Sequence, residues 1–231
     1  MADNIVEIKN IKKSYGIGIN KFDVLQDISL NIKRNEICAI VGPSGAGKST
    51  LLNCIGCIDS FQKGSLKIDD KEVSKMSIEE LSRFRNKKLG FIFQMHNLLL
   101  EFTALENVML PLLIGRMSRR KAKIIAKEII AEFGLENRFS HKPSEMSGGE
   151  NQRIAVARAI ASKPAIILAD EPTGSLDTNN SNHLIDILFK LGKDIGSTII
   201  IVTHDNSIAN KTERIIGLKD GKIIEESSKL N

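Results

Sequence analysis

The sequence predicts an α/β protein, in which a mostly parallel sheet is covered by helices on both faces. Two observations support this fold class. The first is a set of short runs that consist almost entirely of apolar residues, because strands buried on both faces lack the alternation of half-exposed strands. The second is helical periodicity over residues 95–162, between the second and third runs. The runs cover residues 37–41, 89–93, 165–169 and 198–202.

Segments with an alternating pattern lie outside these runs. Residues 4–11 and 23–33 alternate apolar and polar side chains, as edge strands of a mixed sheet do. Residues 215–224 have the pattern of a final hairpin that turns at Asp220-Gly221. These segments add an antiparallel β edge subdomain to the parallel core.

The helical segment contains start and stop signals. Thr103 and Glu106 have the spacing of a capping box, and Pro111 is expected to stop or kink the helix that follows. Ser118 can cap a long basic helix that ends at Gly134. The sequence therefore predicts an α-helical insertion within the α/β protein.

Length and composition suit one globular domain of this kind. The chain has 231 residues, of which 42% are hydrophobic and 26% charged, and these shares are ordinary for a globular domain. We predict a single domain over residues 1–231. Within it, residues 1–94 and 163–231 form the core with the β subdomain, and residues 95–162 form the helical subdomain.

Composition also argues against several classes of protein. No apolar run approaches the roughly 20 residues of a membrane-spanning helix, so we expect no direct membrane span and no signal peptide. Aromatic residues make up 4% of the chain and Trp is absent, which argues against a base-stacking surface and hence against a nucleic-acid partner. Cys38, Cys54 and Cys57 lack a second Cys/His pair at metal-binding spacing, so we interpret them as small core residues.

The apolar run at residues 37–41 leads directly into a phosphate-binding loop with the pattern G-x-x-x-x-G-K-S. The glycines let the backbone aim its N–H groups at phosphate oxygens, the lysine reaches the β- and γ-phosphates, and the serine hydroxyl can hold Mg²⁺. The helix that follows presents its N-terminus to the same anion. The predicted nucleotide-binding residues of this loop are Gly42, Pro43, Ser44, Gly45, Ala46, Gly47, Lys48, Ser49 and Thr50.

Polar residues follow the other three apolar runs. Asp170 and Glu171 end the third run, while Gln94 and His204 follow the second and the fourth. Because ligands bind at the carboxyl ends of parallel strands, we expect these side chains to gather near Lys48. Asp170 and Gln94 are predicted to join Ser49 as ligands of Mg²⁺, and Glu171 is predicted to orient and deprotonate the attacking water.

A second predicted anion site lies at residues 147–149. Ser147, Gly148 and Gly149 open a helix whose bare N–H groups and dipole favour a negative charge. One subunit does not need two phosphate-binding devices, whereas two subunits arranged head to tail would use both. We therefore predict a homodimer that closes on two nucleotides.

Together these motifs resemble those of ATP-binding cassette (ABC) transporter ATPases over essentially the whole chain. Residues 42–49 match the Walker A motif and residues 166–170 the Walker B motif. Residues 146–150 match the L-S-G-G-Q signature, with Met for Leu and Glu for Gln. The resemblance implies a P-loop NTPase (RecA-like) core with an inserted helical signature subdomain, and hydrolysis of ATP with Mg²⁺ as cofactor.

The resemblance also implies roles for single residues. Tyr15 falls where the family stacks an aromatic ring on adenine. Asp177 belongs to the D-loop, in which Ser175 replaces the usual Asn of the branch described next. His204 matches the switch histidine that contacts the γ-phosphate. The implied catalytic residues are Glu171, His204, Lys48 and Gln94.

Within the family, residues 85–115 and 141–150 resemble the LolD/MacB-like branch, and most closely its lipoprotein-releasing LolD group. This implies a peripheral subunit at the cytoplasmic face of the bacterial inner membrane, with LolC/LolE-like integral membrane permease subunits as partners. Its ATP hydrolysis would power release of lipoproteins toward the outer membrane. The alternatives are a MacB-like exporter ATPase for peptides or small molecules and a cell-division ATPase of the same branch. A non-transport ABC protein acting on nucleic acid or ribosomes is an alternative of another class.

A group of apolar side chains follows Gln94. We expect most of them to belong to the helical core and a minority to form a groove for a partner's cytoplasmic helix. The group comprises Leu98, Leu99, Leu100, Phe102, Leu105, Met109 and Leu110.

Overall fold

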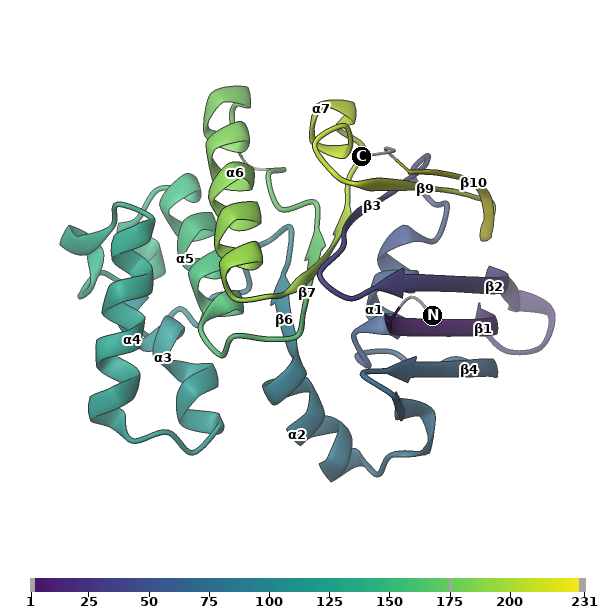
Figure 1. Cartoon of the computed structure of the whole chain (residues 1–231), viewed down its shortest axis with the longest axis horizontal. Coiled ribbons are helices and arrows are strands. Elements are labelled where there is room, and N and C mark those ends of the chain that lie inside the picture. Colours follow the sequence, from purple (N-terminus) through teal and green to yellow (C-terminus); the bar gives the residue numbers. More distant parts are fainter. Residues whose placement is uncertain (1–2, 175, 229–231) are drawn as a thin grey trace. The chain divides into compact units, whose positions relative to one another are not determined.

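The structure, a computed structural model, describes residues 3–174 and 176–228 and divides into two compact units (Figure 1). The first unit is built from the residues up to Ser82 and from Thr198 onward, and the second from Arg83 to Ser197. Ser175 of the D-loop match lies outside the described residues. Across the described ranges, no helix combines the length and the apolar character needed to cross a bilayer. The subdomain boundaries at residues 95 and 162 stay a prediction.

The first unit contains a four-stranded antiparallel sheet with the order β2-β1-β4-β5 (Figure 1). Its strands are β1 (Asn4–Tyr15), β2 (Phe22–Lys33), β4 (Lys63–Ile68) and β5 (Lys71–Glu72). The prediction that residues 4–11 form an edge strand is wrong, because β1 has a partner on both sides. Val6, Ile8 and Ile11 are buried, as is Ile5, whereas the polar residues at positions 9, 10 and 12 are exposed. A central strand with one buried face alternates in the same way as an edge strand.

The first unit also carries parallel strands. β3 pairs in parallel with β8 on one side and with β9 on the other. The elements of this part are β3 (Ile37–Val41), α1 (Lys48–Ile55), β8 (Thr198–Val202), α7 (Asn206–Ala209), β9 (Arg214–Lys219) and β10 (Lys222–Ser228). The turn between β9 and β10 has positive φ at Asp220 (47°) and Gly221 (71°), which confirms the predicted hairpin turn.

The second unit joins two parallel strands to a set of helices. β6 (Leu89–Ile92) pairs in parallel with β7 (Ile166–Asp170), and Ile92 lies opposite Ala169 near their carboxyl ends. The helices are α3 (Ala104–Ile114), α4 (Arg119–Glu132), α5 (Gly148–Ile160) and α6 (Thr178–Asp194). Helix α2 (Ile78–Lys88) begins in the first unit and ends in the second.

The ends of α3 and α4 follow their sequence signals, with one exception. Thr103 and Glu106 form the predicted capping box, and Ser118 is the N-cap of α4. Pro111 does not stop α3, which continues to Ile114. Proline removes one N–H donor, but the next turn closes because the Gly115 N–H donates to the Pro111 carbonyl at 3.0 Å.

The apolar group after Gln94 is more exposed than predicted. Met109 is the buried member of the seven, whereas Leu99, Leu100 and Phe102 are 43%, 68% and 37% exposed. The expectation that most of the group is core is therefore wrong. The physical reason is that the chain between β6 and α3 forms turns over the surface instead of a helix that could bury one face.

Two of the cysteines are core residues, as predicted. Cys38 lies in β3 and Cys54 in α1, and both are buried, while Cys57 is half-buried. Burial raises the pKa of the Cys54 thiol to about 12. At neutral pH this group is therefore a neutral, apolar contributor to packing.

Strand β6 approaches helix α5 closely at Gly90. A Cβ atom placed on Gly90 would lie 2.3 Å from the Ala159 carbonyl oxygen and 3.0 Å from Pro164 Cγ. Backbone atoms cannot yield as a flexible side chain can. Gly90 therefore sets how near the strand and the helix lie.

Gly90→Ala is expected to lower the free energy of unfolding by about 1–3 kcal/mol, the usual cost of overpacking. Gly148→Ala is the matched control for stability, because a Cβ at Gly148 would have no other heavy atom within 4 Å. Urea unfolding followed by circular dichroism measures both variants. Equal stability of the two variants would contradict the close approach of β6 to α5.

Candidate functional site

The phosphate loop joins β3 to α1 and is held against the β9–β10 hairpin. Gly42 has a φ of 153°, and a Cβ there would lie 1.9 Å from the Leu218 carbonyl oxygen, so no side chain fits. The Ala46 N–H donates to the Pro43 carbonyl at 3.2 Å, and the Gly221 N–H donates to the Ala46 carbonyl at 3.1 Å. Backbone contacts therefore shape the loop and anchor it.

The start of α1 offers a donor set that suits a phosphate chain. Gly47 is the N-cap residue, with a φ of 99° and no capping side chain. Lys48 Nζ donates to the carbonyls of Gly42 (2.7 Å) and Pro43 (2.9 Å), which keeps the ammonium beside the loop. The Ser49 side chain is exposed at the first turn. Backbone N–H groups, one ammonium and one hydroxyl together fit a triphosphate that carries Mg²⁺.

Tyr15, the predicted adenine contact, belongs to a polar cluster at the end of β1. Its hydroxyl donates to Asp59 Oδ2 at 2.5 Å, and Lys13 Nζ lies 4.5 Å from the centre of its ring. Lys13 also pairs with Asp59 Oδ1 at 2.6 Å. The bond to Asp59 raises the pKa of the Tyr15 phenol, and the Thr50 side chain acts on it in the opposite direction. Tyr15 therefore lies beside the last residue of the phosphate loop.

His204 lies at the same sheet edge as the phosphate loop, within the first unit. Ile40 of β3 pairs with Val202 of β8, and the Thr203 N–H donates to the Ile40 carbonyl at 3.3 Å. His204 follows directly, and its side chain is exposed. The carboxyl ends of β3 and β8, two of the four strand ends that were predicted to form the site, are thus adjacent.

The second unit brings the other two strand ends together. β7 ends at Asp170, at the level where β6 leads into Gln94. A Cβ at Gly174 would lie 3.4 Å from Cγ and Nε2 of Gln94, so the Gln94 side chain packs against the turn after Glu171. Glu171 itself has a φ of 45°. This left-handed conformation is uncommon for residues other than glycine, and eleven other non-glycine residues among those described also have a positive φ.

Ser147 is the N-cap of α5, the helix of the predicted signature. Its side chain accepts the Glu150 N–H at 3.2 Å, and the Glu150 carboxylate accepts the Ser147 N–H at 2.8 Å, which makes a capping box. Ser147 and Gly148 are exposed, so the helix start is accessible. His96 Nε2 bonds to the Gly148 carbonyl at 2.9 Å and links the segment after Gln94 to the signature.

Two further contacts tie α5 to the segment after β7. Gln152 is 1% exposed, and its Nε2 donates to the Pro172 carbonyl at 2.5 Å. A Cβ at Gly149 would lie 2.9 Å from Leu176 Cδ2, so the signature and the D-loop pack together. These contacts place the signature, Gln94 and Glu171 in one packed region of the second unit.

Asp177 has a structural task at the start of α6. Its carboxylate caps the helix by accepting the N–H groups of Asn179 (3.1 Å) and Asn180 (3.0 Å). The bond from the Asn180 N–H is the largest cause of the lowered pKa of Asp177. Its contact with a nucleotide stays a prediction.

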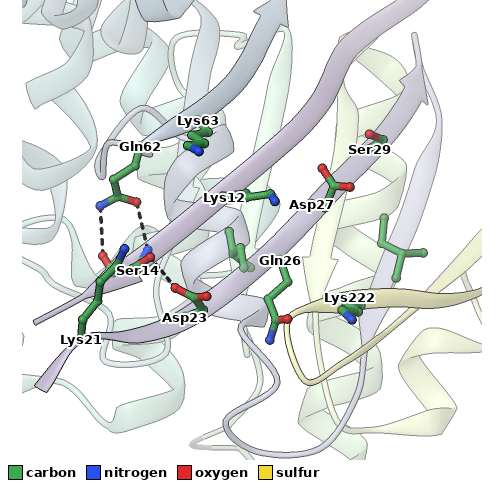
Figure 2. Close-up of a pocket in the computed structure, with 12 residues that line it drawn as sticks. Lys12, Ser14, Lys21, Asp23, Gln26, Asp27, Ser29, Gln62, Lys63 and Lys222 are labelled. Carbon is green, nitrogen blue, oxygen red and sulfur yellow. Dashed lines mark hydrogen bonds between the residues drawn. The ribbon is translucent and has the colours of Figure 1, made fainter. Parts of the chain in front are cut away.

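A separate cleft of about 760 Å³ lies over β1 and β2 in the first unit (Figure 2). Its carboxylates accept hydrogen bonds from neutral groups, Asp23 from Ser14 Oγ (2.7 Å) and Asp27 from Asn10 Nδ2 (3.0 Å). The lysines that line it are Lys12, Lys21, Lys63 and Lys222. No residue of the phosphate loop lines this cleft, so it is distinct from the predicted site.

A family model described as ABC transporter matches residues 25–174, which include both the phosphate loop and Glu171. The chain belongs to the ABC transporter family. Its relatives include the lipoprotein-releasing system ATP-binding protein LolD of Pseudoalteromonas translucida, which is 48% identical over 98% of both chains. The macrolide export ATP-binding/permease protein MacB of Mannheimia succiniciproducens is 46% identical, over 98% of this chain and 35% of that protein.

A solved structure resembles this ABC ATPase closely. It is a dimeric post-hydrolysis state of the ATP-binding cassette MJ0796 bound to ADP and Pi, with a TM-score of 0.90 and 44% identity. The match covers 96% of this chain and 98% of that one. It confirms the predicted P-loop NTPase fold, and the relatives confirm the resemblance to the LolD/MacB-like branch.

Three protein residues are predicted to bind Mg²⁺ in this ABC ATPase, which is enough for an ion that is also bound by a nucleotide. Among residues 3–174 and 176–228, no group of three or more His, Cys, Asp or Glu side chains is arranged to hold a metal ion. Mg²⁺ that is bound to a nucleotide has phosphate oxygens and water molecules as most of its ligands. The oxygen donors of Ser49, Gln94 and Asp170 suit such a site, and their role stays a prediction.

Sequence motifs of this ABC ATPase did not identify the residues that support the site. Asp59 holds Tyr15 across 44 sequence positions, so no local pattern links the two. Gln152 and His96 contact their partners across 20 and 52 positions. His96 lies two positions after the predicted site residue Gln94, and this proximity in the sequence is the one local feature that could have pointed to it.

Asp59→Asn is expected to lower the pKa of Tyr15 toward its ordinary value of about 10, because the phenol loses a charged acceptor. The chain has one Tyr and no Trp, so phenolate absorbance reports on this residue alone. Asp27→Asn is the control, since Asp27 accepts from Asn10 and should leave the titration unchanged. Identical Tyr15 titrations in Asp59→Asn and the unmodified protein would refute the bond.

Proposed function

We propose that this chain is the ATP-hydrolysing subunit of a membrane ABC transporter that releases lipoproteins from the inner membrane toward the outer membrane. The observation that carries the ATPase proposal is the phosphate loop, whose Lys48 and uncapped α1 start fit a triphosphate. The proposal about cargo rests on the 48% identity to a LolD protein over 98% of both chains. The second candidate, an exporter of the MacB kind, is supported by 46% identity.

In this proposal residues of the first unit bind the adenine and the phosphates of the nucleotide. Lys48 and the N–H groups of residues 42–50 bind the phosphates, and Tyr15 stacks on adenine. Ser49, Gln94 and Asp170 hold Mg²⁺, which when bound neutralises charge on the β- and γ-phosphates. The contacts of Tyr15 with Asp59 and Lys13 keep its ring in place before ATP arrives.

Glu171 then orients the attacking water and accepts its proton. His204 contacts the γ-phosphate and stabilises the charge that develops on it. Gln94 packs against the turn that follows Glu171, so both residues are positioned by the same segment.

We further propose that each nucleotide is closed by a second copy of the chain. Ser147, Gly148 and Gly149 would bind the γ-phosphate held by the other subunit, with Asp177 close to the nucleotide. Two observations support this arrangement. The signature is exposed at the open end of α5, and the structurally similar cassette MJ0796 is dimeric.

The partner in the membrane is proposed to be a permease subunit of the LolC/LolE kind, with this chain bound peripherally at the cytoplasmic face. A cleft of about 360 Å³ between α3 and α4 suits a cytoplasmic helix of such a subunit. Leu105, Met109 and Phe139 line the cleft, and its charged lining consists of three basic side chains and the Glu106 carboxylate, which lies 4.0 Å from Arg119. An amphipathic helix with acidic flanks would complement both. The basic side chains are those of Arg119, Lys123 and Lys127.

Glu171→Gln is expected to lower the rate of ATP hydrolysis by about 10²-fold or more, because a general base contributes an effect of that size. ATP binding should remain, and an ATP-bound dimer should accumulate. Steady-state phosphate release and size-exclusion chromatography measure the two effects. Glu128→Gln, at an exposed position of α4, is the control. Normal hydrolysis by Glu171→Gln would remove Glu171 from its role.

Leu105→Glu is expected to abolish copurification with permease subunits from bacterial membranes, since it places a charge in the apolar floor of the α3–α4 cleft. ATP hydrolysis by the isolated protein should stay unchanged. Ile124→Glu, at a 52% exposed position of α4 outside the cleft, should keep the partner. If the unmodified protein copurifies with two permease subunits that release lipoproteins when ATP is added, the result supports the proposal. If it copurifies with an exporter permease, the result supports the second candidate.

A further inference from the structure

The last residue of the signature, Glu150, brings a negative charge to a helix start that is proposed to bind phosphate. It stands where the L-S-G-G-Q pattern has glutamine. Its Oε2 accepts the Ser147 N–H at 2.8 Å and its Oε1 accepts the Arg138 Nε–H at 2.7 Å. The Ser147 N–H first, and Arg138 next, lower the pKa of Glu150 to about 2. The carboxylate is therefore ionised at neutral pH.

Arg138 is placed to neutralise this charge. It ends the short helix Glu136–Arg138, which precedes the signature, and its side chain is 33% exposed against 16% for that of Glu150. The pair is thus partly removed from water, where opposite charges attract more strongly than at a fully exposed site. Within the described ranges, Arg138 is the one cation that pairs with Glu150.

We propose that Arg138 is a positioning residue of the signature, which neutralises Glu150 so that Ser147, Gly148 and Gly149 can bind the γ-phosphate held by a second copy of the chain. The inference rests on the proposed function. The positive end of the α5 dipole can serve the Glu150 carboxylate or an incoming phosphate. An uncompensated Glu150 would repel the phosphate. With Arg138 bound to it, the carboxylate still caps the helix but presents little net charge.

A second task for Arg138 would be purely structural, because it also joins the segment before the signature to α5. The two tasks make different predictions for Glu150→Gln. A capping box accepts Gln as well as Glu at its third position, so this change keeps the cap and removes the charge. If Arg138 acts by neutralising Glu150, dimer formation no longer needs Arg138 once Glu150 is replaced by Gln. If Arg138 acts as a brace, which here means that it holds the segment before the signature against α5, its loss impairs dimer formation in the Glu150→Gln background as well.

The test measures ATP-induced dimer formation by size-exclusion chromatography, with Glu171→Gln in every protein so that the dimer persists. Arg138→Gln is expected to raise the ATP concentration for half-maximal dimer formation about tenfold, which is the order of the effect that a charge has at a helix N-terminus. Binding of a fluorescent ATP analogue to the monomer should stay unchanged. Adding Glu150→Gln to Arg138→Gln should restore dimer formation to the level of Glu150→Gln alone.

Arg138→Lys is the second variant, because it keeps the positive charge and should preserve most of the dimer formation even if Arg138→Gln folds poorly. Unchanged dimer formation in Arg138→Gln would overturn the role of Arg138. A double variant as defective as Arg138→Gln would overturn it too, in favour of the brace. Absence of an ATP-induced dimer in Glu171→Gln alone would instead overturn the proposed function, and with it the inference that rests on it.

Discussion

Parallel pairing of β3 with β8 on one side and β9 on the other is the constraint on which the site of the first unit depends. Because β3 and β8 run in the same direction and Ile40 lies opposite Val202, the phosphate loop and His204 leave the sheet at the same level. On the other side, β9 brings the Leu218 carbonyl against Gly42. The turn after β9 then bonds to Ala46. A hairpin late in the chain thus shapes a loop near its start.

Helix α5 has a comparable part in the second unit. At Gly90 it packs directly on the backbone of β6, and through Gln152 it bonds to the segment after Glu171. His96 links its first turn to the segment after Gln94. The signature is therefore in contact with the segments that carry both Gln94 and Glu171. In the proposed function, these contacts offer a physical route by which events at one nucleotide affect the neighbouring signature.

Features that depend on neighbouring residues could be predicted from the sequence. The apolar runs, the capping box at Thr103 and the turn at Asp220-Gly221 all follow from local patterns, and the structure contains them. The motifs likewise identified the candidate site residues one by one. Helix α6 was missed because its first turn holds Asn179 and Asn180, which are weak helix formers, and its stability begins with the Asp177 cap.

Features that join distant segments could not be predicted. The position of β1 inside its sheet depends on β4, and the bond between Tyr15 and Asp59 depends on how β1 meets the end of α1. Pro111 shows the same limit, since a proline inside a helix costs about 3 kcal/mol, and α3 nevertheless continues to Ile114. Local rules describe what a residue prefers, and packing decides whether that preference prevails.

The left-handed backbone at Glu171 has a consequence for the evolution of this chain. Such a conformation costs on the order of 1 kcal/mol or more in a residue with a Cβ, and Gly or Asn adopts it more readily. A sequence selected for thermal tolerance alone would therefore carry one of those residues at position 171. If Glu171 has its proposed role, the fold accepts this local penalty in order to keep a carboxylate at the end of β7.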